Sequence, residues 1–136
     1  MRILLAKTIE PFLSTESDRI ACDLIQAIQS AGHFCEGLRI PLIEAIALSG
    51  FIRALELENT DLLVCLDQPC HNLRHPAKVL VQWDDAAWKT GTIQGTIHYV
   101  GVVPTQSHPP DKTPTSWESG TRRFGNRDEL LQCILV

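Results

Sequence analysis

The stretch MRILLAKTIEPFLSTESDRIACDLIQAIQSAGHFCEGLRIP, residues 1–41, decides the fold. Its first apolar run, Arg2 to Ala6, is typical of a strand buried on both faces of a sheet. Apolar residues then recur at three- and four-residue spacing, which predicts a helix over 15–31 that Gly32 closes. Residues 34–40 predict a second strand, ended by Pro41. Because crossovers are right-handed, the two strands are expected to be parallel neighbours.

The same reading extends along the chain. Residues 42–58 carry a second helical stripe, and strands are expected over 61–66, 78–83 and 96–103. Four prolines with Ser and Thr predict an irregular loop over 104–120, and a helix-start signature at Asn126 begins a final apolar helix. We therefore expect an α/β fold with a Rossmann-like, mostly parallel sheet flanked by helices. One domain is expected, with a core over 1–103, the loop over 104–120, and a C-terminal helix over 121–136 that packs on the core.

Composition narrows the function classes. The chain has 136 residues, a net charge of -4 and no cluster of Lys and Arg, which argues against a nucleic-acid partner. Its longest apolar stretch falls short of the roughly 20 residues that cross a bilayer, and the N-terminus does not resemble a signal peptide. Five cysteines without a CxxC pair indicate reduced thiols. We expect a cytoplasmic protein without a transmembrane segment.

Candidate site residues follow the predicted strands. Ligands of open parallel sheets bind outside the carboxyl ends of the strands. The turn after the first strand lacks the glycines of a GxGxxG motif, and the chain has no GxxxxGK[ST] loop, so no nucleotide cofactor is expected. The residues expected to line one rim are Lys7, Asp67, His71, Arg74, His75, Asp84, Asp85 and Trp88.

Each candidate has a structural alternative. His71 and His75, together with an aspartate, could supply ligands for a transition metal. Prolines flank their loop, and local hydrogen bonding of the two histidines is the favoured interpretation, so no metal is expected. Asp84 and Asp85 suit a general base or sugar hydroxyls, or they cap a helix that begins near Ala86. Trp83 and Trp88 are suited to stacking on a sugar or a base, although at least one of them is expected in the core.

Cys70 lies beside His71, where an imidazolium would lower a thiol pKa. A structural role is favoured for this cysteine because no third group is placed to orient the histidine.

Two stretches carry a family resemblance. MRILLAKTIEP, DRIACDLIQAIQSAGH and LRIP resemble the N-terminal half of GT-B-fold glycosyltransferases of the family 4 type, the family of sucrose and trehalose-phosphate synthases. DLLVCLDQPCHNLRHPAKVLVQWDDAAW resembles a more specific later stretch of that family. The likeness covers residues 1–91, and its second part rests on matches at Arg74, His75, Pro76, Lys78, Val79, Ala86, Ala87 and Trp88.

The resemblance implies an acceptor-side carbohydrate-binding domain. Relatives usually have a glycine-rich loop after the first strand, where this chain has Glu10, Pro11 and Phe12, and Asp84 and Asp85 make a normally positive or neutral segment acidic. The donor-binding C-terminal Rossmann domain of the family has no counterpart in these residues. We therefore expect no sugar transfer by the chain alone, a sugar or sugar-nucleotide ligand, and a partner that is a donor-domain subunit or a second copy.

Two other readings remain open. One is a noncatalytic interaction domain whose final apolar helix docks on another subunit. The other, ranked last, is a small metal-dependent hydrolase that uses the aspartates and histidines of the rim.

Overall fold

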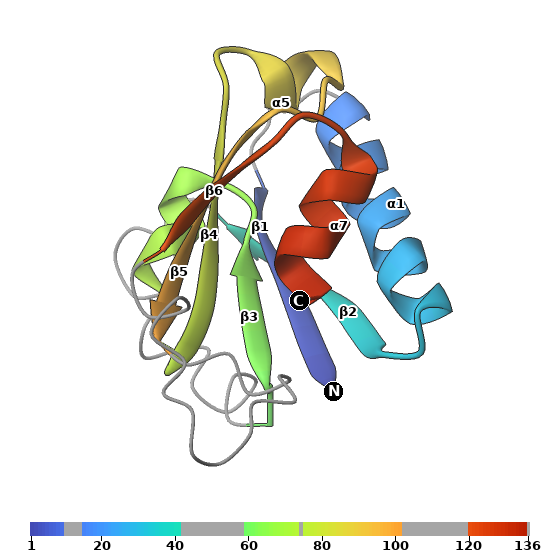
Figure 1. Ribbon diagram of the computed structural model, residues 1–136, viewed down its shortest axis with the longest axis vertical. Helices are drawn as coiled ribbons and strands as arrows, with labels where there is room; N and C mark the ends of the chain where they lie inside the picture. The colour runs from blue at the N-terminus through green and yellow to red at the C-terminus, as the bar shows by residue number, and fades with distance from the viewer. Residues whose placement is uncertain (10–14, 42–58, 74, 102–119, 136) are drawn as a thin grey trace.

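A computed structural model of the chain describes residues 1–9, 15–41, 59–73, 75–101 and 120–135. The helix expected over 42–58 lies outside the described residues, and so does nearly all of the loop expected over 104–120. The remainder is a mixed α/β fold in which helices flank a six-stranded sheet (Figure 1).

The first βαβ unit is confirmed. Strand β1 (Arg2–Ile9) is followed by helix α1 (Thr15–Ser30) and strand β2 (Phe34–Pro41), and β1 and β2 pair in parallel. Gly32 follows the helix with a φ of 94°, a left-handed conformation that glycine adopts without steric cost. The local periodicity of residues 1–41 was thus sufficient to predict this unit.

The sheet continues beyond this unit in the order β2-β1-β3-β4-β5-β6. Strand β3 (Leu62–Cys65), the 3-10 turn η1 (Gln68–Asn72) and strand β4 (Ala77–Trp83) come next in the chain. Helix α5 (Ala87–Thr90) leads to strand β5 (Gly95–Gly101), and strand β6 (Thr121–Phe124) precedes helix α7 (Arg127–Leu135). The strands expected over 61–66, 78–83 and 96–103 are therefore present with small shifts at their ends.

The expectation of a mostly parallel sheet holds only for four strands. Strands β2, β1, β3 and β4 are parallel, whereas β5 runs antiparallel to β4 and β6 antiparallel to β5. The connection from β4 to β5 carries one short helix, α5, which is too little chain for the crossover that a parallel neighbour requires. The chain therefore returns beside β4 in the opposite direction.

Helices α1 and α7 cover the same face of the sheet (Figure 1). The larger buried cluster lies under them and joins Ile3, Leu24, Val79, Ile97 and Leu130. Because side chains alternate along a strand, the intervening residues Leu4, Leu63 and Cys65 form a second buried cluster on the opposite face, together with Cys70 and Leu73 of the η1 segment.

The C-terminal segment contributes a strand as well as the expected helix. Residues 121–124, TRRF, form β6 although only Phe124 is buried. The segment therefore lacks the alternation of apolar and polar residues that predicts a strand. Asn126 Oδ1 accepts from the Glu129 backbone N–H at 2.9 Å, and Glu129 Oε2 accepts from the Gly125 N–H at 2.8 Å. These contacts confirm the predicted start of α7. No helix in the described ranges is long and apolar enough to cross a bilayer.

Candidate functional site

A groove of about 840 Å³ lies at the carboxyl ends of β3 and β4. It continues over the β4–β5 face that α1 and α7 leave uncovered, because Leu80 and Gln82 alternate with the buried Val79 and Val81. The described residues that line it are Asp67, Gln68, His71, Leu80, Val81, Gln82, Trp83, Asp84, Asp85, Ala86, Trp88, Lys89 and His98. Five of the eight predicted site residues therefore share one groove.

Asp67 occupies the position where β3 stops pairing with β1. Its Oδ2 accepts from the Thr8 backbone N–H at 2.8 Å, and its Oδ1 accepts from the Thr8 hydroxyl at 2.6 Å. The carboxylate also caps η1 through a longer contact with the Cys70 N–H. Asp67 thus continues the ladder between β1 and β3, and it closes the crevice where an open α/β sheet ordinarily takes its ligand.

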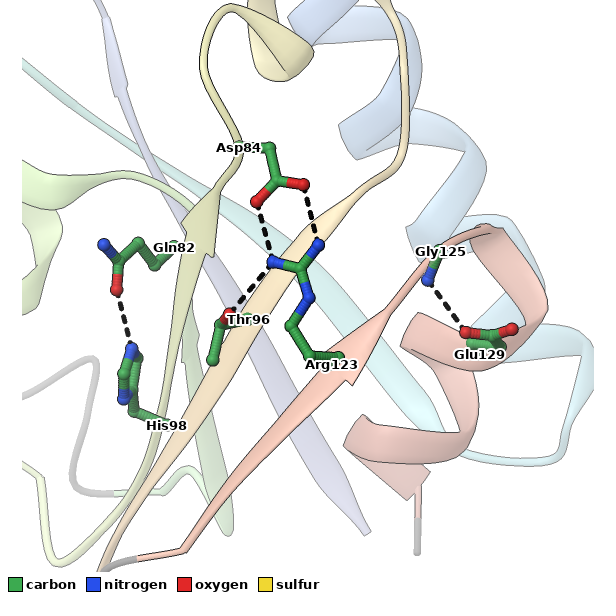
Figure 2. A network of polar contacts seen from close by, with 7 residues as sticks. All are labelled: Gln82, Asp84, Thr96, His98, Arg123, Gly125 and Glu129. Atoms are coloured by element: carbon green, nitrogen blue, oxygen red, sulfur yellow. Dashed lines mark hydrogen bonds and ion pairs between the residues drawn. The ribbon is translucent and has the colours of Figure 1, made fainter.

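Two imidazoles lie along the groove. The Nε2–H of His71 donates to the Val81 carbonyl at 3.3 Å, beyond the last residue of β4 that pairs with β3. Burial lowers the pKa of His71, which favours its neutral form. His98 on β5 donates to Gln82 Oε1 at 2.8 Å across the antiparallel pair (Figure 2).

Asp84 is held by an arginine from the last strand. Arg123 of β6 donates to both Asp84 oxygens, at 2.7 and 2.8 Å, and to the Thr96 hydroxyl at 3.2 Å (Figure 2). The guanidinium holds the pKa of Asp84 below its ordinary range. Helix α5 begins after Ala86 without any side-chain cap, so the alternative in which Asp84 or Asp85 caps this helix is wrong. Asp85 is exposed on the rim.

Two stacked tryptophans are among the residues that line the groove. The rings of Trp83 and Trp88 lie 4.5 Å apart between centroids at 27°, and Phe124 packs edge-on against Trp83. The Nε1–H of Trp83 donates to the Leu66 carbonyl. Trp88 is 7% exposed, and its buried Nε1–H has no acceptor among the residues that the structure describes. Ala86, just before α5, has a φ of 60°, a left-handed conformation that is strained for a residue with a Cβ.

The other predicted residues lie elsewhere. Lys7 is 5% exposed and forms an ion pair with Asp18 of α1, on the helix-covered side of β1. His75 forms local hydrogen bonds: its Nε2–H donates to the Thr60 carbonyl at 2.7 Å, and its Nδ1 accepts from the Ala77 N–H at 3.0 Å. Arg74 lies outside the described residues. The expectation of one continuous rim therefore holds for residues that follow β3 and β4, but neither Lys7 nor His75 is among the residues that line the groove.

The residues of the groove that sequence reasoning missed include Gln82, Lys89 and His98. Gln82 and His98 belong to strands, where a polar side chain normally indicates a solvated face. Their proximity depends on the antiparallel pairing of β4 with β5, which places Leu80 opposite His98 and Gln82 opposite Thr96. Polar residues on the outward positions of both strands were the only available signal.

Cys70 does not have the surroundings of a nucleophile. Its side chain is fully buried, and burial raises the pKa of the thiol. Its Sγ lies 3.5 Å from the Thr8 hydroxyl, which itself donates to Asp67. Among the described residues, no three His, Cys, Asp or Glu side chains gather as a metal site would require.

The arrangement is suited to holding a polar molecule against aromatic rings, with carboxylates, amide groups and two imidazoles also lining the groove. Comparison of the chain with protein-family models, with curated proteins and with solved structures finds no match.

Proposed function

We propose that this chain is the acceptor-side lobe of a glycosyltransferase-type architecture and that its groove binds an uncharged sugar. The proposal rests on one observation, the groove at the carboxyl ends of two parallel strands that combines stacked tryptophans with acidic side chains. Carboxylates accept hydrogen bonds from neighbouring hydroxyls, and aromatic rings pack against the apolar C–H faces of a sugar.

Charge favours a neutral ligand over a phosphorylated one. Asp67, Asp84 and Asp85 line the groove, whereas Lys89 is the cation among its described lining residues. The lowered pKa of His71 keeps that imidazole neutral near pH 7. A phosphate or pyrophosphate would therefore meet net negative charge, and binding of a nucleotide-sugar is assigned to a lobe outside these 136 residues.

The polar contacts favour binding over catalysis by this lobe. Asp84 is paired with Arg123, and Asp67 accepts hydrogen bonds from the backbone N–H and the hydroxyl of Thr8. Both ring nitrogens of His75 contact backbone groups, which weighs against the hydrolase reading.

The interaction-domain reading depended on a free apolar helix. Helix α7 instead buries Leu130, Cys133 and Ile134 against the core of its own chain.

Calorimetric titration with glucose, maltose, trehalose, glucose 6-phosphate and UDP-glucose tests the proposal. A neutral saccharide is expected to bind with a dissociation constant of about 1 mM or lower, and glucose 6-phosphate more weakly than glucose. UDP-glucose is expected to be neither transferred nor hydrolysed. Failure of every neutral saccharide to bind, or turnover of UDP-glucose by the purified chain, contradicts the proposal.

A matched pair of charge-neutralising variants locates the site. Asp85→Asn removes a carboxylate from the groove rim, whereas Asp128→Asn removes one whose side chain is 80% exposed on α7. The first variant is expected to weaken saccharide binding by several fold, and the second to bind as the wild type does.

A further inference from the structure

The Trp88 side chain, which lines the groove, has a donor that is unsatisfied within the described part of the chain. Its Nε1–H is buried without an acceptor among the described residues, whereas the Nε1–H of the neighbouring Trp83 reaches the Leu66 carbonyl. Buried polar groups are nearly always hydrogen-bonded, so an exception of this kind requires a physical explanation. A second molecule that supplies the acceptor is one such explanation.

The segment that carries Trp88 is short and strained. Helix α5 has four residues and lies between two left-handed residues, Ala86 with a φ of 60° and Gly91 with a φ of 83°. The first of these conformations is unfavourable for alanine, and strained backbone persists where the surrounding structure holds it. Here the holding contacts include the bidentate pair of Arg123 with Asp84, two residues before Ala86. Because the Trp88 Nε1–H is buried in this conformation, a ligand in the groove reaches it only if the turn that carries it moves.

We propose that the ligand of the groove accepts a hydrogen bond from Trp88 Nε1–H and that the α5 turn moves when it binds, separating the Trp83–Trp88 stack. This inference rests on the proposed function, because it assigns a donor and a motion to the same groove. The ligand atom it requires is a hydroxyl or ring oxygen, which an uncharged sugar supplies. Trp88 is then a specificity-determining residue in addition to an aromatic wall.

A pair of tryptophan variants tests the hydrogen bond. Trp88→Phe removes an N–H that has no acceptor among the described residues, whereas Trp83→Phe removes the N–H that donates to the Leu66 carbonyl. The urea midpoint should therefore fall less for Trp88→Phe than for Trp83→Phe. Saccharide affinity should nevertheless fall about tenfold in Trp88→Phe, as expected for the loss of one hydrogen bond.

The motion is measured in the wild type by near-ultraviolet circular dichroism, because the signal of an indole depends on the groups packed against it, here a second indole at a centroid distance of 4.5 Å. Addition of maltose, trehalose or glucose should reduce this signal in proportion to the saturation measured by calorimetry. Wild-type binding with unchanged affinity in Trp88→Phe overturns the hydrogen bond and leaves the sugar groove standing, whereas an unchanged dichroism signal at saturation overturns the motion. If the wild type binds none of these saccharides, the proposed function and this inference both fail.

Discussion

Replacing Asp67 by alanine should destabilise the protein strongly, because one carboxylate extends the β1–β3 ladder. Its two oxygens accept from the Thr8 backbone N–H and hydroxyl at 2.8 and 2.6 Å, and Thr8 is 1% exposed. Each buried donor left without an acceptor costs about 1–3 kcal/mol. Asp67 itself is partly exposed, so water entering the space offsets part of the loss, and we expect Asp67→Ala to cost about 2–4 kcal/mol.

Urea unfolding followed by far-ultraviolet circular dichroism measures this cost. A domain of this kind has roughly 5–15 kcal/mol of stability, so the variant should remain folded with a clearly lower midpoint. Asp67→Asn keeps one acceptor oxygen and should cost about 1 kcal/mol. Thr8→Val removes the hydroxyl alone, and in that background the cost of Asp67→Ala should fall by about 1 kcal/mol. A change below about 0.5 kcal/mol for Asp67→Ala in the wild-type background would refute the reasoning.

Three further measurements test the rest of the structure. Asn126→Ala removes the acceptor for the Glu129 N–H at the start of α7 and should cost about 1 kcal/mol in urea unfolding; an unchanged midpoint would mean that water replaces the cap. Because burial lowers the pKa of His71 in the folded protein below its value near 6.5 in the unfolded chain, protonation favours unfolding. The stability contribution of neutral His71 is complete above the unfolded-state pKa and is lost as the pH falls toward the folded-state pKa. Between about pH 7 and 5 the wild-type urea midpoint should therefore fall more steeply than that of His71→Gln, and parallel curves would contradict the burial of this ring. Finally, a thiol reagent at neutral pH should modify the exposed Cys22 quickly and the four buried cysteines only as the protein unfolds, so a second fast thiol would contradict the packing around the sheet.

The parts of the fold that the sequence could predict are those with local signals. The βαβ unit of residues 1–41 has an apolar run, an amphipathic helix and a closing glycine, and each of these can be recognised from a short stretch of sequence. The direction of β5 had no such signal, since it depends on the length and path of a connection. Strand β6 was missed because three of its four residues are exposed.

The candidate site was predictable to the extent that strand ends mark it. Asp67 and Asp84 come just after β3 and β4, Trp88 lies in the short helix that follows β4, and all three line the groove. What those side chains contact was not predictable, because their partners are far away in the sequence: Thr8 lies 59 positions from Asp67, and Arg123 lies 39 positions from Asp84. Such pairings follow from the topology of the sheet, which no local pattern encodes.

The contact of Arg123 with Asp84 also bears on the order in which the molecule forms during synthesis. Strands β1 to β4 and helix α1 precede residue 84, so the parallel core has all of its described strands early in translation. The arginine that fixes the rim beside α5 belongs to β6, and α7 follows it along the chain. The four parallel strands are therefore synthesised before the residues that hold the rim of the groove, and we expect the groove to take its final shape late in folding.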